Sequence, residues 1–316
     1  MLYRKILSYS ILILCITSLI AVNENAGTTG FNNLQVIYSA RAMGMAKAMT
    51  GVYNSLEGLQ FNPAAILGVE DKIISSTYNS YFVDTNGGGA HFLYSKSEEV
   101  SYGLILHYLN FGEIERTFID DNYNYQDTDE TFTANNIIFG ASAARNINVA
   151  LDLGVSIKYI MDKIDTYSAS AVVADLGLIH HPVLDKIKVG VALRNVGTQL
   201  TYYTEKKYKE KLPFTIAAGL SYQMNPKLIG CIDVSKASSS DLTMKFSTEY
   251  KLHQMLSLRA GFNSNNTDWK TGGTWDWASG LTFGTGFNWK NYVIDYGIAS
   301  YGDLGFVNQV SLQYRF

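Results

Sequence analysis

The chain of 316 residues has few cysteines, few prolines and little net charge. Of its two cysteines, Cys15 lies in an apolar N-terminal segment, so Cys231 has no partner for an intramolecular disulfide. A formal net charge of -3 argues against nucleic acid as a partner, because nucleic-acid-binding proteins usually carry a concentrated basic surface. After residue 26, no apolar run approaches the roughly 20 residues of a transmembrane helix. A closed hydrogen-bonded sheet must therefore stabilise the fold.

Motifs for catalysis are also missing. The chain has no phosphate-binding loop, no H-E-x-x-H sequence and no nucleophile elbow. His180 and His181 are adjacent, so on a strand their side chains point to opposite faces and do not share a metal ion. His91, His107 and His253 lie apart, with no spacing that links them. We therefore expect a protein that is not an enzyme and that has no cofactor and no metal site.

The N-terminus is typical of an exported protein. Arg4 and Lys5 precede a nearly unbroken apolar run over residues 6–22, and the small residues Ala21 and Ala26 offer cleavage positions. The run is short for a membrane-spanning helix, which favours a signal peptide over a retained anchor. We expect residues 1–26 to be removed and the mature protein to reach the bacterial outer membrane.

The end of the chain alternates strictly between apolar and polar side chains. Val310, Leu312, Tyr314 and Phe316 are apolar or aromatic, and the residues between them are polar. A period of two predicts a strand with one apolar and one polar face. An aromatic final strand in an exported chain is typical of outer-membrane β-barrels. We interpret Leu312, Tyr314 and Phe316 as a C-terminal strand signal, and expect outer-membrane lipid and the barrel assembly machinery as partners.

The rest of the mature chain has the pattern of a meander. Its alternating segments are each near the length of about 9 to 11 residues that a tilted membrane strand needs. We predict an all-β fold, a transmembrane antiparallel β-barrel of about 14 strands over residues 70–316, with a small N-terminal helical plug over residues 27–69. The predicted strands are 71–84, 89–96, 100–111, 131–144, 148–162, 168–180, 187–201, 213–223, 228–235, 242–252, 255–264, 279–289, 291–301 and 306–316.

Loop lengths support this fold. In an antiparallel meander every second connection lies on the same side of the membrane. Short periplasmic turns and long outer loops are typical of bacterial barrels, and this pattern counts against a soluble secreted β-sandwich. With Phe316 on the periplasmic side, the short connections 97–99, 145–147, 181–186, 224–227, 253–254 and 290 are periplasmic, and the long ones 112–130, 202–212 and 265–278 are outer loops.

Strand alternation assigns one set of charged side chains to the barrel interior. Both signs are present, which predicts ion pairs across the lumen, because an unpaired buried charge is unfavourable. A structural lattice of ion pairs is favoured over a selectivity filter. The predicted lumen charges are Asp152, Lys158, Asp175, Arg194, Asp233, Lys245, Glu249, Arg259, Asp295 and Arg315.

The outer loops carry further candidate surfaces. The stretch 113–130 is acidic but lacks the glycine and spacing of a calcium loop, so a solvated loop is favoured. Lysines 206, 207, 209 and 211 could contact phosphate groups or acidic partners, or simply keep their loop soluble. Trp269, Trp275 and Trp277 are unusual in an exposed loop. They predict either an anchor at the membrane interface or a docking surface for a ligand or a secreted partner.

The segment before the strands differs in pattern. Residues 36–51 contain helix formers and small residues without sustained alternation, which predicts a short helix or a compact plug. Asn62 can cap a turn, and Pro63 fits the first position of that turn. The small residues that would let this segment pack closely against a barrel wall are Ala40, Ala42, Gly44, Ala46 and Ala48.

A resemblance to known proteins rests on the region from Gly30 to Leu67. Its plug motif consists of Arg41, Gly44, Asn62, Pro63 and Ala64. Together with the predicted strands and the aromatic end, this motif resembles the PorV/PorQ family of outer-membrane proteins. More distantly, it is similar to the FadL long-chain fatty-acid transporters, which share an N-terminal plug and an Asn-Pro-Ala motif.

The resemblance implies a plugged barrel and two alternative functions. For the PorV branch it implies protein secretion or envelope assembly through binding of exported proteins, which is our leading hypothesis. The alternative is a FadL-like transporter of hydrophobic small molecules such as fatty acids. Uptake predicts an apolar pocket between plug and wall, whereas secretion predicts an exposed outer aromatic surface and a plug that blocks passage.

Overall fold

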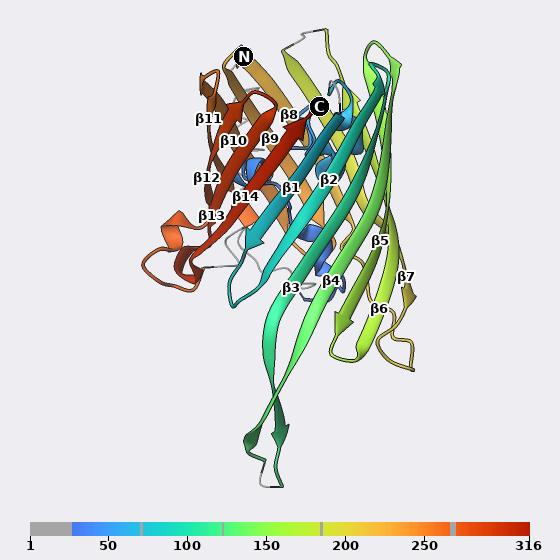
Figure 1. The fold of residues 1–316 in the computed structure, drawn as a ribbon, viewed down its shortest axis with the longest axis vertical. Helices are drawn as coiled ribbons and strands as arrows, with labels where there is room; N and C mark the ends of the chain where they lie inside the picture. Colours follow the sequence, from blue (N-terminus) through green and yellow to red (C-terminus); the bar gives the residue numbers. More distant parts are fainter. Residues whose placement is uncertain (1–26, 70–71, 122, 184–185, 266–269) are drawn as a thin grey trace, which may run out of the picture.

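A computed structural model describes residues 27–69, 72–121, 123–183, 186–265 and 270–316, so the predicted signal peptide lies outside the described residues. Within them, fourteen antiparallel strands close into one barrel, with β1 paired to β14 (Figure 1). The predicted fold class is confirmed. The strands are β1 (Lys72–Ser80), β2 (Asn86–Ser97), β3 (Val100–Ile119), β4 (Tyr125–Asn148), β5 (Leu151–Ile164), β6 (Tyr167–His180), β7 (Ile187–Thr201), β8 (Thr215–Asn225), β9 (Leu228–Ala237), β10 (Leu242–His253), β11 (Leu256–Asn263), β12 (Leu281–Trp289), β13 (Tyr292–Ser300) and β14 (Phe306–Arg315).

The wall has one apolar and one polar face, as the alternation predicts. In β14, Gln309 and Ser311 are buried, whereas Val310 and Leu312 are exposed on the outside. Alternate burial also runs along β1, β5 and β12. The outer wall therefore presents apolar side chains to lipid, and polar side chains face the lumen. In the described part of the chain, no helix is both long and apolar enough to cross a membrane.

The two ends of the barrel differ in their connections. We call the end that carries Phe316 the C-terminal rim and the opposite end the long-loop rim. Strands join at the C-terminal rim through the short connections 98–99, 149–150, 181–186, 226–227, 254–255 and 290–291. The connections 202–214 and 264–280 lie at the long-loop rim. The predicted short connections all lie at the C-terminal rim, and two of the three predicted long connections lie at the opposite rim.

The stretch predicted as an outer loop at 112–130 is instead mostly strand, so this prediction is wrong. β3 continues to Ile119 and β4 begins at Tyr125, and their hairpin projects well beyond the long-loop rim (Figure 1). Pairs such as Ile114 with Phe132 continue the ladder. Aromatic and β-branched residues favour strands, and this preference prevails over the high acidic content of the stretch.

The gap between the predicted strands 71–84 and 89–96 is also misplaced, because Gly87 and Gly88 lie in a strand. β2 already begins at Asn86. The turn lies at 81–85, where the Tyr81 amide donates to the Thr85 carbonyl at 2.9 Å.

The N-terminal segment forms the plug and lies inside the barrel (Figure 1). Ser39 caps the first α-helix of the plug, Ala40–Gly44, because its side chain accepts a hydrogen bond from the Ala42 amide at 3.2 Å. Asn62 caps the last turn through the Ala64 amide at 3.2 Å, with Pro63 at the first position, as predicted. The plug consists of η1 (Asn32–Gln35), α2 (Ala40–Gly44), α3 (Gly58–Phe61) and η2 (Pro63–Ile66).

Candidate functional site

The plug approaches the wall where the wall has glycine. At each of nine strand glycines, a Cβ atom would lie within 3.0 Å of an atom of the plug. Glycine in a strand interior often marks a position that another backbone approaches closely. These wall glycines are Gly89, Gly103, Gly154, Gly177, Gly190, Gly219, Gly261, Gly284 and Gly297.

Small plug residues meet the wall glycines directly. A Cβ at Gly284 would lie 3.0 Å from the Cα of Gly44, and a Cβ at Gly261 would lie 2.7 Å from the Cβ of Ala46. The backbone of Pro63 lies over Gly154. Sequence reasoning anticipated the small residues of the plug but missed those of the wall, because an isolated strand glycine has no distinctive pattern.

A buried network of ion pairs joins the plug to β10, β11 and β13. Arg41 donates to both carboxylate oxygens of Glu249, at 2.9 and 3.1 Å, and to Glu57 at 3.0 Å. Arg259 donates to Glu249 and to Asp295, both at 2.6 Å. Bidentate pairs of this kind are among the stronger charge-assisted interactions in proteins. Arg41 of the plug motif therefore anchors the plug to the wall.

This network determines the protonation states of Glu57 and Arg41. Burial alone would raise the pKa of Glu57, but the Arg41 guanidinium and the Ser55 and Ser39 hydroxyls together hold it below its ordinary value. Burial alone would lower the pKa of Arg41, but the carboxylates of Glu249 and Glu57 raise it well above its ordinary value. Both groups are therefore charged at neutral pH.

The remaining predicted lumen charges are mostly buried, and some of them are paired. Lys158 forms an ion pair with Asp175 at 2.5 Å. His181 contacts the fully buried Asp152 at 2.6 Å. Arg315 is the exception, because it is exposed at the end of β14.

Asp233 and Lys245 lie opposite each other across β9 and β10, but within the described part of the chain neither forms an ion pair. Asp233 accepts a hydrogen bond from the Thr50 amide at 2.9 Å, and its other carboxylate oxygen has no partner there. Lys245 is only 7% exposed, and among the described residues it contacts only the Ser235 hydroxyl, at 3.0 Å.

The structure brings together two histidines that the sequence had left unconnected. The Nε2 atoms of His91 and His107 lie 2.8 Å apart, and the Gln60 side-chain nitrogen lies 2.9 Å from His91. Gly89 pairs with His107 across β2 and β3, which places His91 diagonally opposite on the inner face. Across the described ranges, no group of three or more His, Cys, Asp or Glu residues could hold a metal ion.

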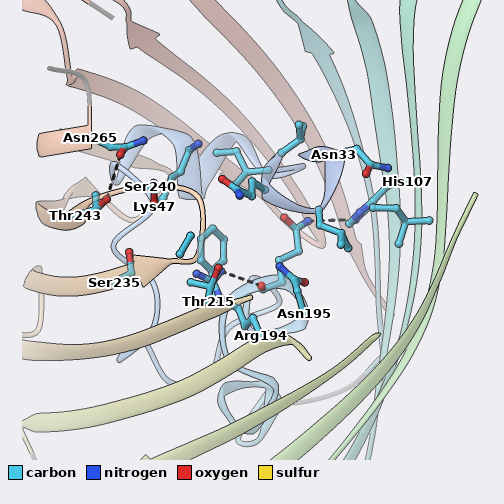
Figure 2. A pocket seen from close by; sticks show the side chains of 18 of the residues that line it. Asn33, Lys47, His107, Arg194, Asn195, Thr215, Ser235, Ser240, Thr243 and Asn265 are labelled. Carbon is cyan, nitrogen blue, oxygen red and sulfur yellow. Dashed lines mark hydrogen bonds between the residues drawn. The ribbon is translucent and has the colours of Figure 1, made fainter. Parts of the chain in front are cut away.

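A cavity of about 110 Å³, which we call the inner cavity, lies between the plug and the wall (Figure 2). Plug residues such as Leu34 and Phe61, together with Ile105 and Ile138 of the wall, give it an apolar part. Four cationic side chains also line it: Lys47, Lys158, Arg194 and Lys245.

Three of these cations have no carboxylate partner within ion-pair distance in the described structure. Lys158 is paired with Asp175, but Lys245 is not paired with an acid. Arg194 donates weakly to the Gln60 carbonyl at 3.4 Å and lies over the Phe61 ring at 5.6 Å. Sequence reasoning missed Lys47, although it is a lone charge within the small-residue run of 42–49.

A second cavity of about 570 Å³, the outer cavity, lies toward the long-loop rim. Met43, Tyr81, Phe82 and Tyr301 give it an apolar and aromatic lining. It shares lining residues with the inner cavity, among them Lys47. The two cavities are therefore adjacent: the outer one combines an apolar and aromatic part with polar residues such as Asn263 and Asn265, and the inner one is lined by four cations.

The other predicted sites lie on the outside. Leu312 and Phe316 are exposed on the outer wall, and the Tyr314 ring lies 4.9 Å from that of Phe316. Trp275 and Trp277 are exposed, while Trp269 lies outside the described residues.

No protein-family model and no curated protein sequence matches the chain. Solved structures do match it. The toluene transporter TbuX of Ralstonia pickettii has a TM-score of 0.61 at 16% identity, over 90% of this chain and 99% of that one. The toluene transporter TodX of Pseudomonas putida has a TM-score of 0.61 at 12% identity, over 87% and 96%. The CymD monoaromatic hydrocarbon channel has a TM-score of 0.60 at 11% identity, over 89% and 99%.

The chain shares the fold of these transporters. The likeness covers 87–90% of this chain and 96–99% of those chains. At these identities the likeness concerns the fold alone.

Proposed function

We propose that the protein is a non-enzymatic conduit of the bacterial outer membrane for small hydrophobic molecules that carry an acidic group, such as fatty acids. The observation that carries this proposal is the pair of adjacent cavities. An apolar chain would lie in the outer cavity against Phe82 and Tyr301, and its acidic group would lie in the inner cavity near Lys47, Arg194 and Lys245.

Charge is the first argument for an acidic group. A buried ammonium or guanidinium group without a counter-ion is unfavourable. Lys245 is buried and contacts only a hydroxyl among the described residues. Asp233 lies opposite Lys245 on β9 but beyond ion-pair distance. An anionic group in the inner cavity would give Lys245 a direct counter-ion, and each hydrogen bond to such a group contributes about 1.5–3 kcal/mol.

The fold is the second argument. TbuX, TodX and CymD are named for toluene and monoaromatic hydrocarbons, so the shared fold supports a hydrophobic cargo. Those hydrocarbons are uncharged, whereas the inner cavity of this chain is lined by four cations. We therefore expect this protein to take a cargo that has both an apolar part and an acid.

The secretion hypothesis and the membership in the PorV/PorQ family remain hypotheses. An exposed aromatic loop is compatible with secretion, but neither the fold likeness nor the cavities favour it over uptake. We therefore give precedence to the transport of small molecules.

The proposal is tested by comparing decanoic acid with its methyl ester, which has the same chain and no charge. We expect purified protein to bind the acid, and Lys245→Met to weaken this binding at least about tenfold, because the removed contact is worth about 1.5 kcal/mol or more. Binding of the ester should change little. Arg315→Met removes an exposed cation and serves as the control. Equal responses of acid and ester to Lys245→Met would refute the assignment of the acidic group, and failure of both to bind would refute the conduit.

A further inference from the structure

Two tryptophans are exposed in the loop between β11 and β12. The side chain of Trp275 is 56% exposed and that of Trp277 is 70% exposed, and their ring centroids lie 6.1 Å apart. Large exposed aromatic side chains that lie together mark an interaction surface more often than isolated ones do.

The loop is folded so that both rings are held outward. The Asp276 carboxylate accepts hydrogen bonds from the Thr271 and Gly272 amides at 3.2 and 2.8 Å. Asp303, from the connection between β13 and β14, accepts one from the Trp275 amide at 3.4 Å. Figure 1 shows this orange loop turned sideways from the barrel axis, beside the end of β13, and not across the mouth of the barrel.

Strand length places the loop close to the membrane surface. β11 has 8 residues, and β12 and β13 have 9 each. A tilted strand needs about 9 to 11 residues to cross the hydrocarbon core, so these strands end near its boundary. β3, with 20 residues, continues far beyond that level. The long-loop rim therefore lies close to the membrane surface on the side of the tryptophans and extends farther from it on the side of β3.

The surface around the tryptophans continues the lipid-facing wall. Phe283 of β12 is 55% exposed and Phe306 of β14 is 54% exposed, both on the outside. Leu304, next to Asp303, is also exposed. Exposed apolar side chains of the wall are thus followed at the rim by Leu304, Trp275 and Trp277.

We propose that residues 270–280 of the β11–β12 loop lie on the membrane and insert Trp275 and Trp277 among the lipid headgroups of the outer leaflet. Tryptophan favours this interface because its ring is apolar and its N–H group finds hydrogen-bond partners there. The lipid surface is the occupant that the strand lengths and the continuity with the wall favour. These tryptophans thereby fix how deeply the β11–β13 side of the barrel sits in the membrane, and this role does not depend on what the lumen carries.

Single-tryptophan variants test this proposal in phosphatidylcholine vesicles. One variant keeps Trp277 and another keeps Trp275, with the other three tryptophans replaced by phenylalanine. A third keeps Trp289 at the C-terminal rim as a matched control. We expect lipids brominated near the headgroup to quench Trp277 at least twofold more than lipids brominated deep in the chain, and acrylamide in water to quench it weakly.

Two results would overturn the proposal. One is strong acrylamide quenching of Trp277 without quenching by brominated lipid, which would place the loop in water and leave it as a docking surface for a soluble partner. The other is a double variant Trp275→Phe/Trp277→Phe that retains the full shallow quenching of the wild-type protein. Heat-dependent mobility on a denaturing gel shows for each variant that the barrel is intact, so a folding defect is not mistaken for a negative result.

Discussion

Replacing Arg41 by methionine should release the plug without unfolding the barrel. The substitution removes the contacts to Glu249 and Glu57 while keeping an apolar side chain of similar length. Glu249 keeps Arg259 at 2.6 Å, but Glu57 loses its only ion pair within the described residues and keeps only its hydrogen bonds to Ser39 and Ser55.

The expected effect follows from the burial of this pair. Removing one partner of a buried ion pair typically destabilises by about 3–5 kcal/mol. The Arg41 side chain is 21% exposed, which favours the lower end of that range, about 3 kcal/mol. Because each 1.4 kcal/mol corresponds to a factor of ten, the local opening equilibrium should rise roughly a hundredfold.

Hydrogen exchange measures this opening directly. Amides that donate to carbonyls of α2, such as that of the C-cap residue Met45, which donates to the Arg41 carbonyl at 3.1 Å, should exchange about a hundredfold faster, while amides of the wall strands should be unchanged. Adding Glu57→Gln to Arg41→Met should restore part of the protection, because it removes the orphaned carboxylate. Arg315→Met is the control. The reasoning fails if α2 exchanges at the wild-type rate, or if plug and wall accelerate together.

Two further outcomes follow from the plug. Gly154→Ala should destabilise the plug by about 1–3 kcal/mol, because the new methyl group meets the backbone of Pro63. Gly230→Ala should have little effect, because its methyl group meets only the flexible end of the Met224 side chain. Thermal unfolding of the two variants tests this difference. The pKa of Glu57 is lowered in the folded protein, so its contribution is complete above the ordinary value of 4.5 and is lost as the pH falls through the folded value. Protease protection of the plug should therefore be constant from pH 7 to about 5 and decline only in stronger acid, and a decline already near pH 6 would contradict the assignment.

The strands could be predicted from the sequence because lipid outside and polar side chains inside impose a period of two. This holds for β14, where Val310 and Leu312 alternate with Gln309 and Ser311. The projecting part of the β3–β4 hairpin could not be predicted in the same way. It extends beyond the long-loop rim, where lipid no longer requires every second side chain to be apolar.

The contacts between plug and wall were harder to predict from the sequence, because they join residues that are far apart in the chain. Arg41 and Glu249 are 208 positions apart, and nothing local to either residue selects the other. Lys245 was predicted to face inward, and the register places it opposite Asp233 on β9, but the side chains lie beyond ion-pair distance, which the register alone does not show. The wall glycines can be recognised as contact positions only when the position of the plug inside the barrel is known.

The fit between plug and wall also restricts the order of assembly. The plug precedes every strand in the chain, and it lies against glycines of nine of the strands. The barrel closes where β1 pairs with β14, the last strand to be synthesised. A folded plug could not be threaded into the finished ring past these close contacts. A plug that folds early must therefore be enclosed before the final seam forms, and one that is still unfolded at closure can fold only inside the finished barrel.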